Sequence, residues 1–194
     1  MGKGRLEAFT DGVFAIIITI MVLEMKVPEG SDLHALAAGL PVFLAYALSY
    51  ANVGIFWSNH HHVLHASERV DGRSLWANLF LLFWVSLLPF IIRWMDDTSF
   101  APLPTAAYGA VLAMAAVSYL LLERALIAAS GPGSMLAKAV GRDPKTKLSL
   151  LVYVAAIALA FVRPWIAIAL YVLVALMWLV PDRRIETIGE TDKE

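Results

Sequence analysis

The chain has no cysteine, and few of its 194 residues are charged. The absence of cysteine excludes a disulfide framework, a thiolate metal site and a thiol nucleophile. Charged residues make up only 16% of the sequence, whereas 60% of the side chains are hydrophobic. A soluble domain usually carries about 45–50% apolar residues. The composition therefore argues against a water-soluble enzyme and predicts that lipid is the main solvent.

Sequence motifs of the common enzyme classes are missing as well. The chain contains no His-Glu-x-x-His zinc motif, no Gly-x-Ser-x-Gly nucleophile turn and no glycine loop that cradles a phosphate. Its net charge of −1 offers no basic track for the phosphates of a nucleic acid. We therefore expect no enzyme activity, no bound cofactor and no nucleic-acid partner.

Long apolar runs predict an all-α membrane protein with six transmembrane helices. They lie at about residues 6–27, 36–60, 75–94, 105–127, 148–162 and 165–180. The last two come from one apolar stretch, which is too long for a single span of about 20 residues. Arg163-Pro164 interrupts that stretch, because proline disfavours helix at the preceding residue; a single kinked helix is the alternative. Residues 1–181 are interpreted as one domain and residues 182–194 as a cytoplasmic tail.

The basic residues predict how the chain is oriented in the membrane. With six spans and a cytoplasmic N-terminus, twelve of the fifteen lysines and arginines fall on the cytoplasmic side. Only Lys26, Arg93 and Arg163 fall outside. Cytoplasmic loops of membrane proteins carry an excess of positive charge, so both termini are expected in the cytoplasm.

The first span carries an aspartate and a stripe of residues at helical spacing. Asp11 lies near its start, and a carboxylate at membrane depth needs hydrogen-bond donors. The stripe lies on a largely different face of the helix and consists of Ile16, Thr19, Ile20 and Leu23. Such a stripe either packs against helices or lipid, or lines a pore. In a pore, hydrophobic rings could dewet and a threonine oxygen could meet a cation.

A second polar cluster lies on the same side of the membrane as Asp11. Trp57 and His60 end the second span, and Asn78 opens the third. Each of these side chains has an N–H group that can donate a hydrogen bond to Asp11.

Three more histidines follow this cluster, at positions 61, 62 and 65. They are either solvated or part of a metal site. His34 is expected across the membrane, which leaves too few ligands for a catalytic metal. We expect no metal centre, and the sequence assigns no role to these three histidines.

Acidic residues cluster just outside the first span. Glu24, Glu29 and Asp32 lie there, and Lys26 is the one cation nearby in the sequence. The segment is either a solvated loop or a pore mouth that concentrates cations, an effect screened over roughly 8–10 Å at ordinary salt.

The start of the first span resembles the signature of a known channel family. Arg5-x-x-x-Phe9-Thr10-Asp11 is similar to the Arg-x-x-x-Phe-Ser-Asp signature of the transmembrane protein 175 family of potassium channels. Threonine stands in place of the serine and keeps the hydroxyl. Further matching positions are Trp57, His60, Asn78, Leu88 and Pro89. The resemblance is strongest over residues 5–24 and weak after about residue 95.

The resemblance implies a passive, potassium-selective cation channel of a bacterial plasma membrane. It implies a homotetramer in the lipid bilayer, with the first helix of each subunit lining a central pore for potassium and other monovalent cations. Ile16 would form the narrowest ring, Thr19 would set cation preference, and Ile20 and Leu23 would add hydrophobic layers. The implied structural polar network consists of Arg5, Phe9, Thr10, Asp11, Trp57, His60 and Asn78.

A small secondary transporter or permease is the alternative function. Such a protein is expected to have inverted repeats and helices broken near the membrane midplane. The sequence shows neither feature.

Overall fold

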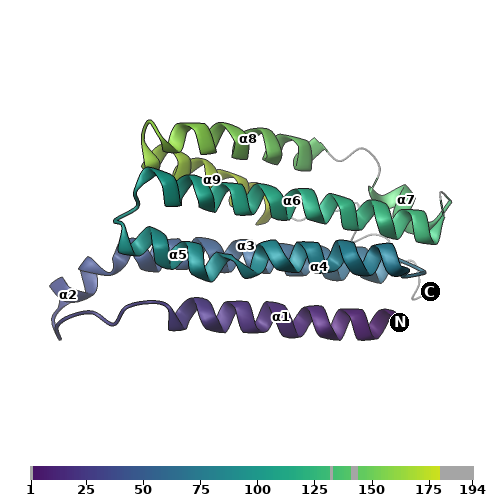
Figure 1. The fold of residues 1–194 in the computed structure, drawn as a ribbon, viewed down its shortest axis with the longest axis horizontal. Coiled ribbons are helices and arrows are strands. Elements are labelled where there is room, and N and C mark those ends of the chain that lie inside the picture. Colours follow the sequence, from purple (N-terminus) through teal and green to yellow (C-terminus); the bar gives the residue numbers. More distant parts are fainter. Residues whose placement is uncertain (1, 132, 141–143, 180–194) are drawn as a thin grey trace.

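Helices account for all regular structure in a computed structural model that describes residues 2–131, 133–140 and 144–179. The long helices run side by side (Figure 1). α1 lies along one side of the bundle, α3 with α4 and α5 lies in the middle, and α6, α8 and α9 lie on the far side. The predicted tail at 182–194 lies outside the described residues.

The long helices overlap the apolar runs of the sequence, and two short helices, α2 and α7, lie at or beyond their edges. Their bounds are α1 Lys3–Leu23, α2 Leu33–Ala38, α3 Leu40–Ala66, α4 Gly72–Ser86, α5 Leu88–Asp97, α6 Pro102–Ser130, α7 Met135–Val140, α8 Pro144–Ala160 and α9 Pro164–Leu179. Four segments are long and apolar enough to cross a membrane, and they are Lys3–Leu23, Leu40–Ala66, Gly72–Asp97 and Pro102–Ser130. The chain is therefore an all-helical membrane protein. Helices α8 and α9 are shorter, at 17 and 16 residues.

The third span is two helices, where the sequence suggested one uninterrupted run over 75–94. Helix α4 ends at Ser86 and α5 begins at Leu88, with Pro89 in its first turn. Proline has no N–H and its ring crowds the carbonyl four residues earlier, which kinks a helix. Leu87 between them keeps right-handed helical angles, φ −80° and ψ −14°, so the segment bends without unwinding.

The long C-terminal apolar stretch is also two helices. The chain leaves helix after Ala160 and starts α9 at Pro164. The amides of Val162 and Arg163 both donate to the carbonyl of Leu159, at 3.0 and 2.8 Å. This turn lets α8 and α9 lie antiparallel against α6 (Figure 1).

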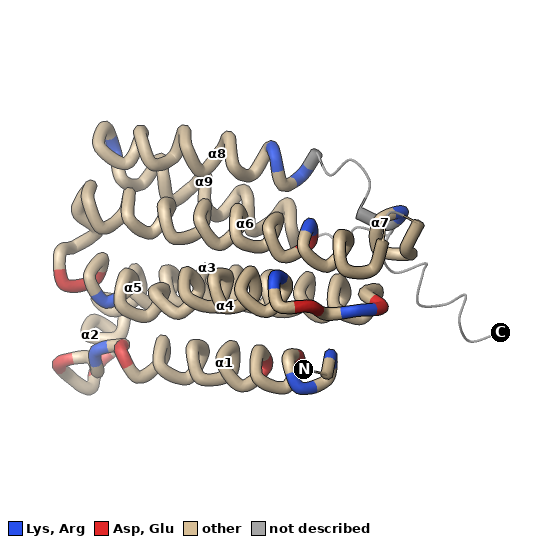
Figure 2. Tube along the Cα trace, turned by 45° about the vertical axis from the view of Figure 1, so that its right-hand side comes forward, with Lys and Arg blue, Asp and Glu red and all other residues tan. Residues whose placement is uncertain are grey.

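Charged residues lie mainly toward the two ends of the bundle (Figure 2). Between these ends the helices carry mainly uncharged residues, drawn in tan. This distribution matches an apolar slab between two aqueous phases.

The far side of the bundle is held together by buried tyrosines. The rings of Tyr108 and Tyr171 lie 5.4 Å apart, and that of Tyr153 lies 6.2 Å from Tyr171. The Tyr171 hydroxyl donates to the carbonyl of Thr105 at 3.1 Å. Gly109 gives Tyr171 the space to reach that carbonyl, because a Cβ at this position would overlap the phenol.

We expect Gly109→Ala to lower the free energy of unfolding by about 1–3 kcal/mol, because overpacking forces a buried ring out of place. Gly72→Ala is the matched control, since a Cβ on Gly72 meets no atom within 4 Å. Thermal unfolding of the purified protein in detergent measures both variants. Equal stability of the two would contradict the packing described for Tyr171.

Candidate functional site

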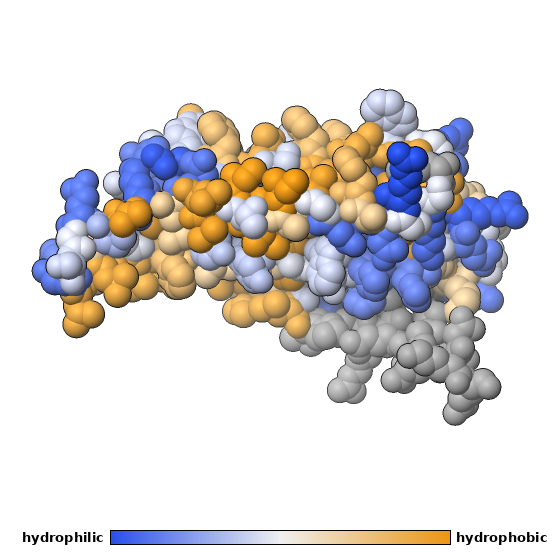
Figure 3. All heavy atoms as spheres, turned by 90° about the horizontal axis from the view of Figure 1, so that it is seen from below, coloured by the Kyte–Doolittle hydropathy of each residue, from blue (hydrophilic) through white to orange (hydrophobic). Residues whose placement is uncertain are grey.

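Helix α1 packs against the bundle with one face only. Its buried residues recur every three or four positions, as one face of a helix requires, and they are Leu6, Thr10, Phe14, Ile17 and Met21. They contact α3, α4 and α5. Figure 3 looks onto the α1 side of the bundle and shows an orange hydrophobic band between two blue ends.

All four residues of the predicted stripe lie on the open face of α1. Ile16 is 58% exposed, Ile20 40% and Leu23 79%, and Thr19 is exposed beside them. A groove of about 430 Å³ runs along this face toward α5, and Ile16 and Ile20 form part of its wall. Within the described chain, no element covers the stripe, so its partner is lipid, a second chain or a pore.

Thr19 presents an oxygen on this apolar face. Its hydroxyl donates to the carbonyl of Ile16 at 2.8 Å, a common bond for threonine within a helix. Because the hydrogen points back to the backbone, the lone pairs of the oxygen stay free to accept or to coordinate. Nearby exposed side chains of the stripe offer no such atom.

A relay of hydrogen bonds joins α1, α4 and α3 in the interior. The Asn78 amide donates to the Thr10 hydroxyl at 2.9 Å, and His60 Nε2 lies 2.9 Å from the Asn78 oxygen. All three side chains are buried. Since the amide oxygen only accepts, His60 Nε2 must carry the hydrogen. The His60 Nδ1 is then left without a partner among the described residues.

Asp11 bonds to one of its expected partners and lies apart from the others. Asp11 is only partly buried, and its carboxylate accepts from Trp57 Nε1 at 2.8 Å. It does not join the relay of Asn78 and His60. Arg5 and Phe9 are exposed, and the Arg5 side chain makes no hydrogen bond or ion pair with the described residues. Helix periodicity explains the difference, because Asp11 and Thr10 point about 100° apart.

The C-terminal end of α1 is more evenly charged than the sequence suggested. Arg93 of α5 reaches the Glu24 carboxylate at 3.6 Å and its carbonyl at 3.1 Å. Lys26 pairs with Asp97 at 2.6 Å and with Asp96 at 3.6 Å, instead of facing Glu24, Glu29 and Asp32. Arg93 also pairs with Asp97 at 3.0 Å. These two residues are four positions apart on one helix, so the sequence alone could have indicated this pair.

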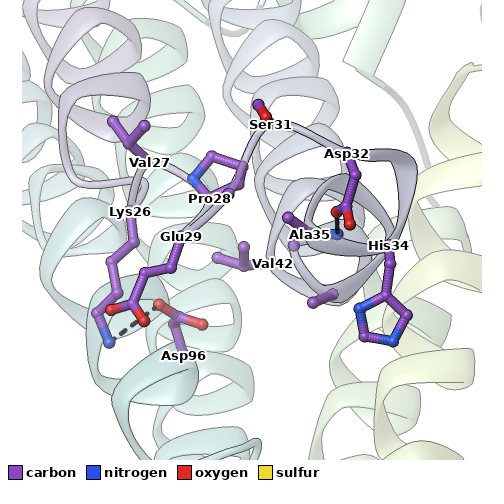
Figure 4. Close-up of a pocket in the computed structure, with 13 residues that line it drawn as sticks. Lys26, Val27, Pro28, Glu29, Ser31, Asp32, His34, Ala35, Val42 and Asp96 are labelled. Carbon is purple, nitrogen blue, oxygen red and sulfur yellow. Dashed lines mark hydrogen bonds and ion pairs between the residues drawn. The ribbon is translucent and has the colours of Figure 1, made fainter.

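Glu29 and Asp32 line an open cleft of about 780 Å³ beyond the C-terminal end of α1. Figure 4 shows Glu29 beside the pair of Lys26 and Asp96, whereas His34 lies across the cleft. Asp32 caps α2 by accepting from the Ala35 amide at 2.8 Å. Of the three acids Glu24, Glu29 and Asp32, Glu29 is therefore the one with no hydrogen bond or ion pair to a described residue.

No group of three or more histidine, aspartate or glutamate side chains is placed to hold a metal ion in the described ranges. The histidines at 61, 62 and 65 lie on the last turns of α3, which runs six residues beyond the predicted end of the second span. They are on a helix and not in a loop.

Comparison with known proteins matches this geometry to one family. The family model described as endosomal/lysosomal potassium channel TMEM175 matches residues 5–89. A protein named potassium channel from Chryseobacterium sp. (strain P1-3) is 53% identical over 186 residues, covering 96% of this chain and 97% of its own. Another protein of that name, from Chamaesiphon minutus, is 32% identical over 189 residues and is covered over 91% of its length.

One solved structure is similar along most of the chain. It is the crystal structure of a lysosomal potassium-selective channel TMEM175 homolog from Chamaesiphon minutus. Its TM-score is 0.77 at 26% sequence identity, and the match covers 92% of this chain and 96% of the other.

We expect Asn78→Leu to lower the free energy of unfolding by about 1–3 kcal/mol, because it leaves buried polar groups of His60 and Thr10 without partners. Adding Thr10→Val removes one of these orphaned groups. The double variant should therefore lose less stability than the two single losses added together. Chemical or thermal unfolding in detergent measures the cycle, and strictly additive losses would argue against the relay.

Proposed function

The chain belongs to the transmembrane protein 175 family of potassium channels, and on this basis we propose that it forms a passive, potassium-selective cation channel. Four copies surround a central pore in a bacterial plasma membrane, and each contributes the open face of α1. The observation that carries this proposal is the exposed stripe of Ile16, Thr19, Ile20 and Leu23.

An open face on α1 is needed for such a pore. The subunit buries the opposite face of α1 against α3, α4 and α5, so the helix is anchored independently of any neighbour. The stripe can then face a symmetry axis without loss of subunit packing. The adjoining groove between α1 and α5 leaves room for a neighbouring subunit to lie against it.

Six spans with both termini in the cytoplasm complete the proposed topology. Helix α8 has 17 residues and α9 has 16, close to the lower limit of about 17 residues for a spanning helix. Lys145 and Lys147 near the start of α8, and Arg163 at the turn, can reach polar headgroups from slightly short helices. The excess of basic residues on the N-terminal side of the membrane sets the orientation.

In this proposal Ile16 forms the constriction of the pore and Thr19 supplies an oxygen that contacts the ion. Four isoleucine side chains meeting at the axis provide no oxygen, so an ion that passes them must keep part of its water. A narrow apolar ring also empties of water easily and so acts as a gate. Thr19 lies about one turn further along, where its oxygen can replace water that the ion has lost.

The alternative function, a secondary transporter, depends on helices that break in the membrane. The interruption at Leu87 is a proline kink whose backbone stays helical, and apolar Leu88 beside it is buried. Transporter breaks instead expose backbone groups that bind substrate and ion. The kink therefore does not favour transport over passive conduction.

Ile16→Asn should give a folded protein that conducts more and prefers potassium less, because a polar ring wets the constriction. Ile17→Asn is the matched control, since Ile17 is 3% exposed and faces the subunit core. That variant should lose about 1–3 kcal/mol of stability through an unsatisfied buried amide. Current recordings with potassium and sodium, beside unfolding in detergent, separate the two effects. A stable Ile16→Asn protein with unaltered permeation would exclude this residue from the pore.

Thr19→Val should reduce potassium preference without blocking current. Valine has nearly the shape of threonine but no oxygen, so the ring keeps its width and loses its ligand. The reversal potential under potassium on one side and sodium on the other reports the change. Unchanged selectivity would mean that the Thr19 oxygen does not contact the ion.

Neutralising the outer acids by Glu29→Gln with Asp32→Asn should lower potassium conductance at low salt and leave selectivity alone. Asparagine keeps the cap of α2 while it removes the charge. The screening length falls from about 30 Å at 0.01 M salt to about 3 Å at 1 M, so the difference should vanish at high salt. Conductance measured across this range tests the idea, and equal conductance at 0.01 M would refute it.

A further inference from the structure

Three aromatic rings stack along one face of α3 at its cytoplasmic end. The ring of Trp57 lies 6.3 Å from that of His61 at an angle of 28°. His61 in turn lies 5.9 Å from His65 at 18°. The three residues are spaced by four positions, which places them above one another on a helix.

Each of these residues contacts a charged side chain of α1. Trp57 Nε1 donates to Asp11 at 2.8 Å, and His61 Nδ1 lies 3.1 Å from a Glu7 oxygen. The Lys3 ammonium donates to the carbonyl of His65 at 2.9 Å. The contacts step by four residues along both helices in opposite directions, as antiparallel packing requires. We call these three contacts the ladder.

The middle contact of the ladder is the one that responds to protons. A Glu7 carboxylate can only accept, so His61 Nδ1 must carry a hydrogen in this geometry. Adding a proton at Nε2 gives the ring a full charge without breaking that bond. A hydrogen bond between two charged groups is stronger than one with a neutral donor. Histidine gains its charge between about pH 5 and 8.

Several charged or titratable groups surround His61. Helix α1 presents the carboxylates of Glu7 and Asp11 to this region, while the Lys3 ammonium is held at the carbonyl of His65. On α3, the neighbouring ring of His62 lies 5.9 Å away, at the same centroid distance as His65, and both would oppose the charge if protonated. His60 faces inward and is bonded to Asn78.

We propose that Glu7 and His61 are positioning residues that hold the cytoplasmic end of α1 against α3, and that the hold tightens when His61 is protonated. The functional consequence rests on the proposed function, in which α1 carries the constriction. Because the ladder fixes one end of that helix, channel activity responds to pH on the cytoplasmic side.

The test uses the full chain, reconstituted in bilayers for potassium current and held in detergent for thermal unfolding. Glu7→Gln keeps an acceptor and removes the charge, and His61→Asn keeps a short N–H donor and cannot be protonated. His62→Asn is the matched control, because His62 makes no hydrogen bond to α1 among the described contacts. Each protein is measured at cytoplasmic pH 8 and pH 6, with the outer pH fixed.

Wild type and His62→Asn should change current by about two- to fivefold between the two pH values, the coupling expected of one exposed ion pair. Their stability at pH 6 relative to pH 8 should exceed that of Glu7→Gln and His61→Asn. A pH response that persists undiminished in both of these variants would overturn the proposal, as would an absent response in wild type.

The unfolding measurement also separates this proposal from the proposed function. If no protein conducts potassium, the channel is refuted, while a pH-dependent stability difference that disappears in Glu7→Gln and His61→Asn still supports the ladder. Conversely, potassium current with no such stability difference refutes the ladder and leaves the channel intact.

Discussion

The rotation of α1 about its own axis is the constraint on which the rest of the structure depends. Thr10 is held inward by Asn78, which is held in turn by His60. Each residue advances about 100° around a helix, so Thr19 lies on the side opposite Thr10. One buried hydrogen bond thereby turns the threonine oxygen and its apolar neighbours outward. Breaking the bond would remove one of the contacts that set this rotation and would leave polar groups unpaired in an apolar interior.

The two ends of α1 are fixed by contacts of a different kind. At the N-terminal end of α1, charged and aromatic side chains of α1 and α3 meet in the partly exposed ladder, where His61 is 48% exposed and Glu7 29%. At the C-terminal end, Arg93 of α5 binds α1 through Glu24, the residue after its last turn. Between these anchors, no other described element covers the apolar middle of the open face. In an oligomer with this face at its axis, water and ions would contact the apolar middle, as the proposed channel requires.

Much of this arrangement follows from local sequence pattern. Apolar runs located the long helices, and the spacing of three and four placed Ile16, Thr19, Ile20 and Leu23 on one face, because helical geometry alone determines both. Proline chemistry could have predicted the kink at Pro89, but the apolar run around it was interpreted as one continuous span. The helix through His61 and His65 extended further than composition suggested, since contacts with α1 stabilise histidines there.

Partners from different helices were harder to predict. The sequence grouped Asp11 with three donors, Trp57, His60 and Asn78. Asp11 does bond to Trp57, but the Asn78 amide donates to Thr10, the preceding residue. The sequence also placed Lys26 among the nearby acids of its own segment. In the structure Lys26 forms ion pairs with Asp96 and Asp97 instead. Such choices depend on how antiparallel helix ends are aligned, and no local pattern encodes that alignment.

The central claim is that the open face of α1 lines the ion path, and accessibility of single cysteines tests it most directly. The chain has no native cysteine, so each introduced thiol is the sole target of a charged thiol reagent. Potassium current should be blocked by the reagent at Thr19→Cys and Leu23→Cys, and should be unaffected at Phe14→Cys and Met21→Cys. Block at the inward pair with none at the outward pair would contradict the claim.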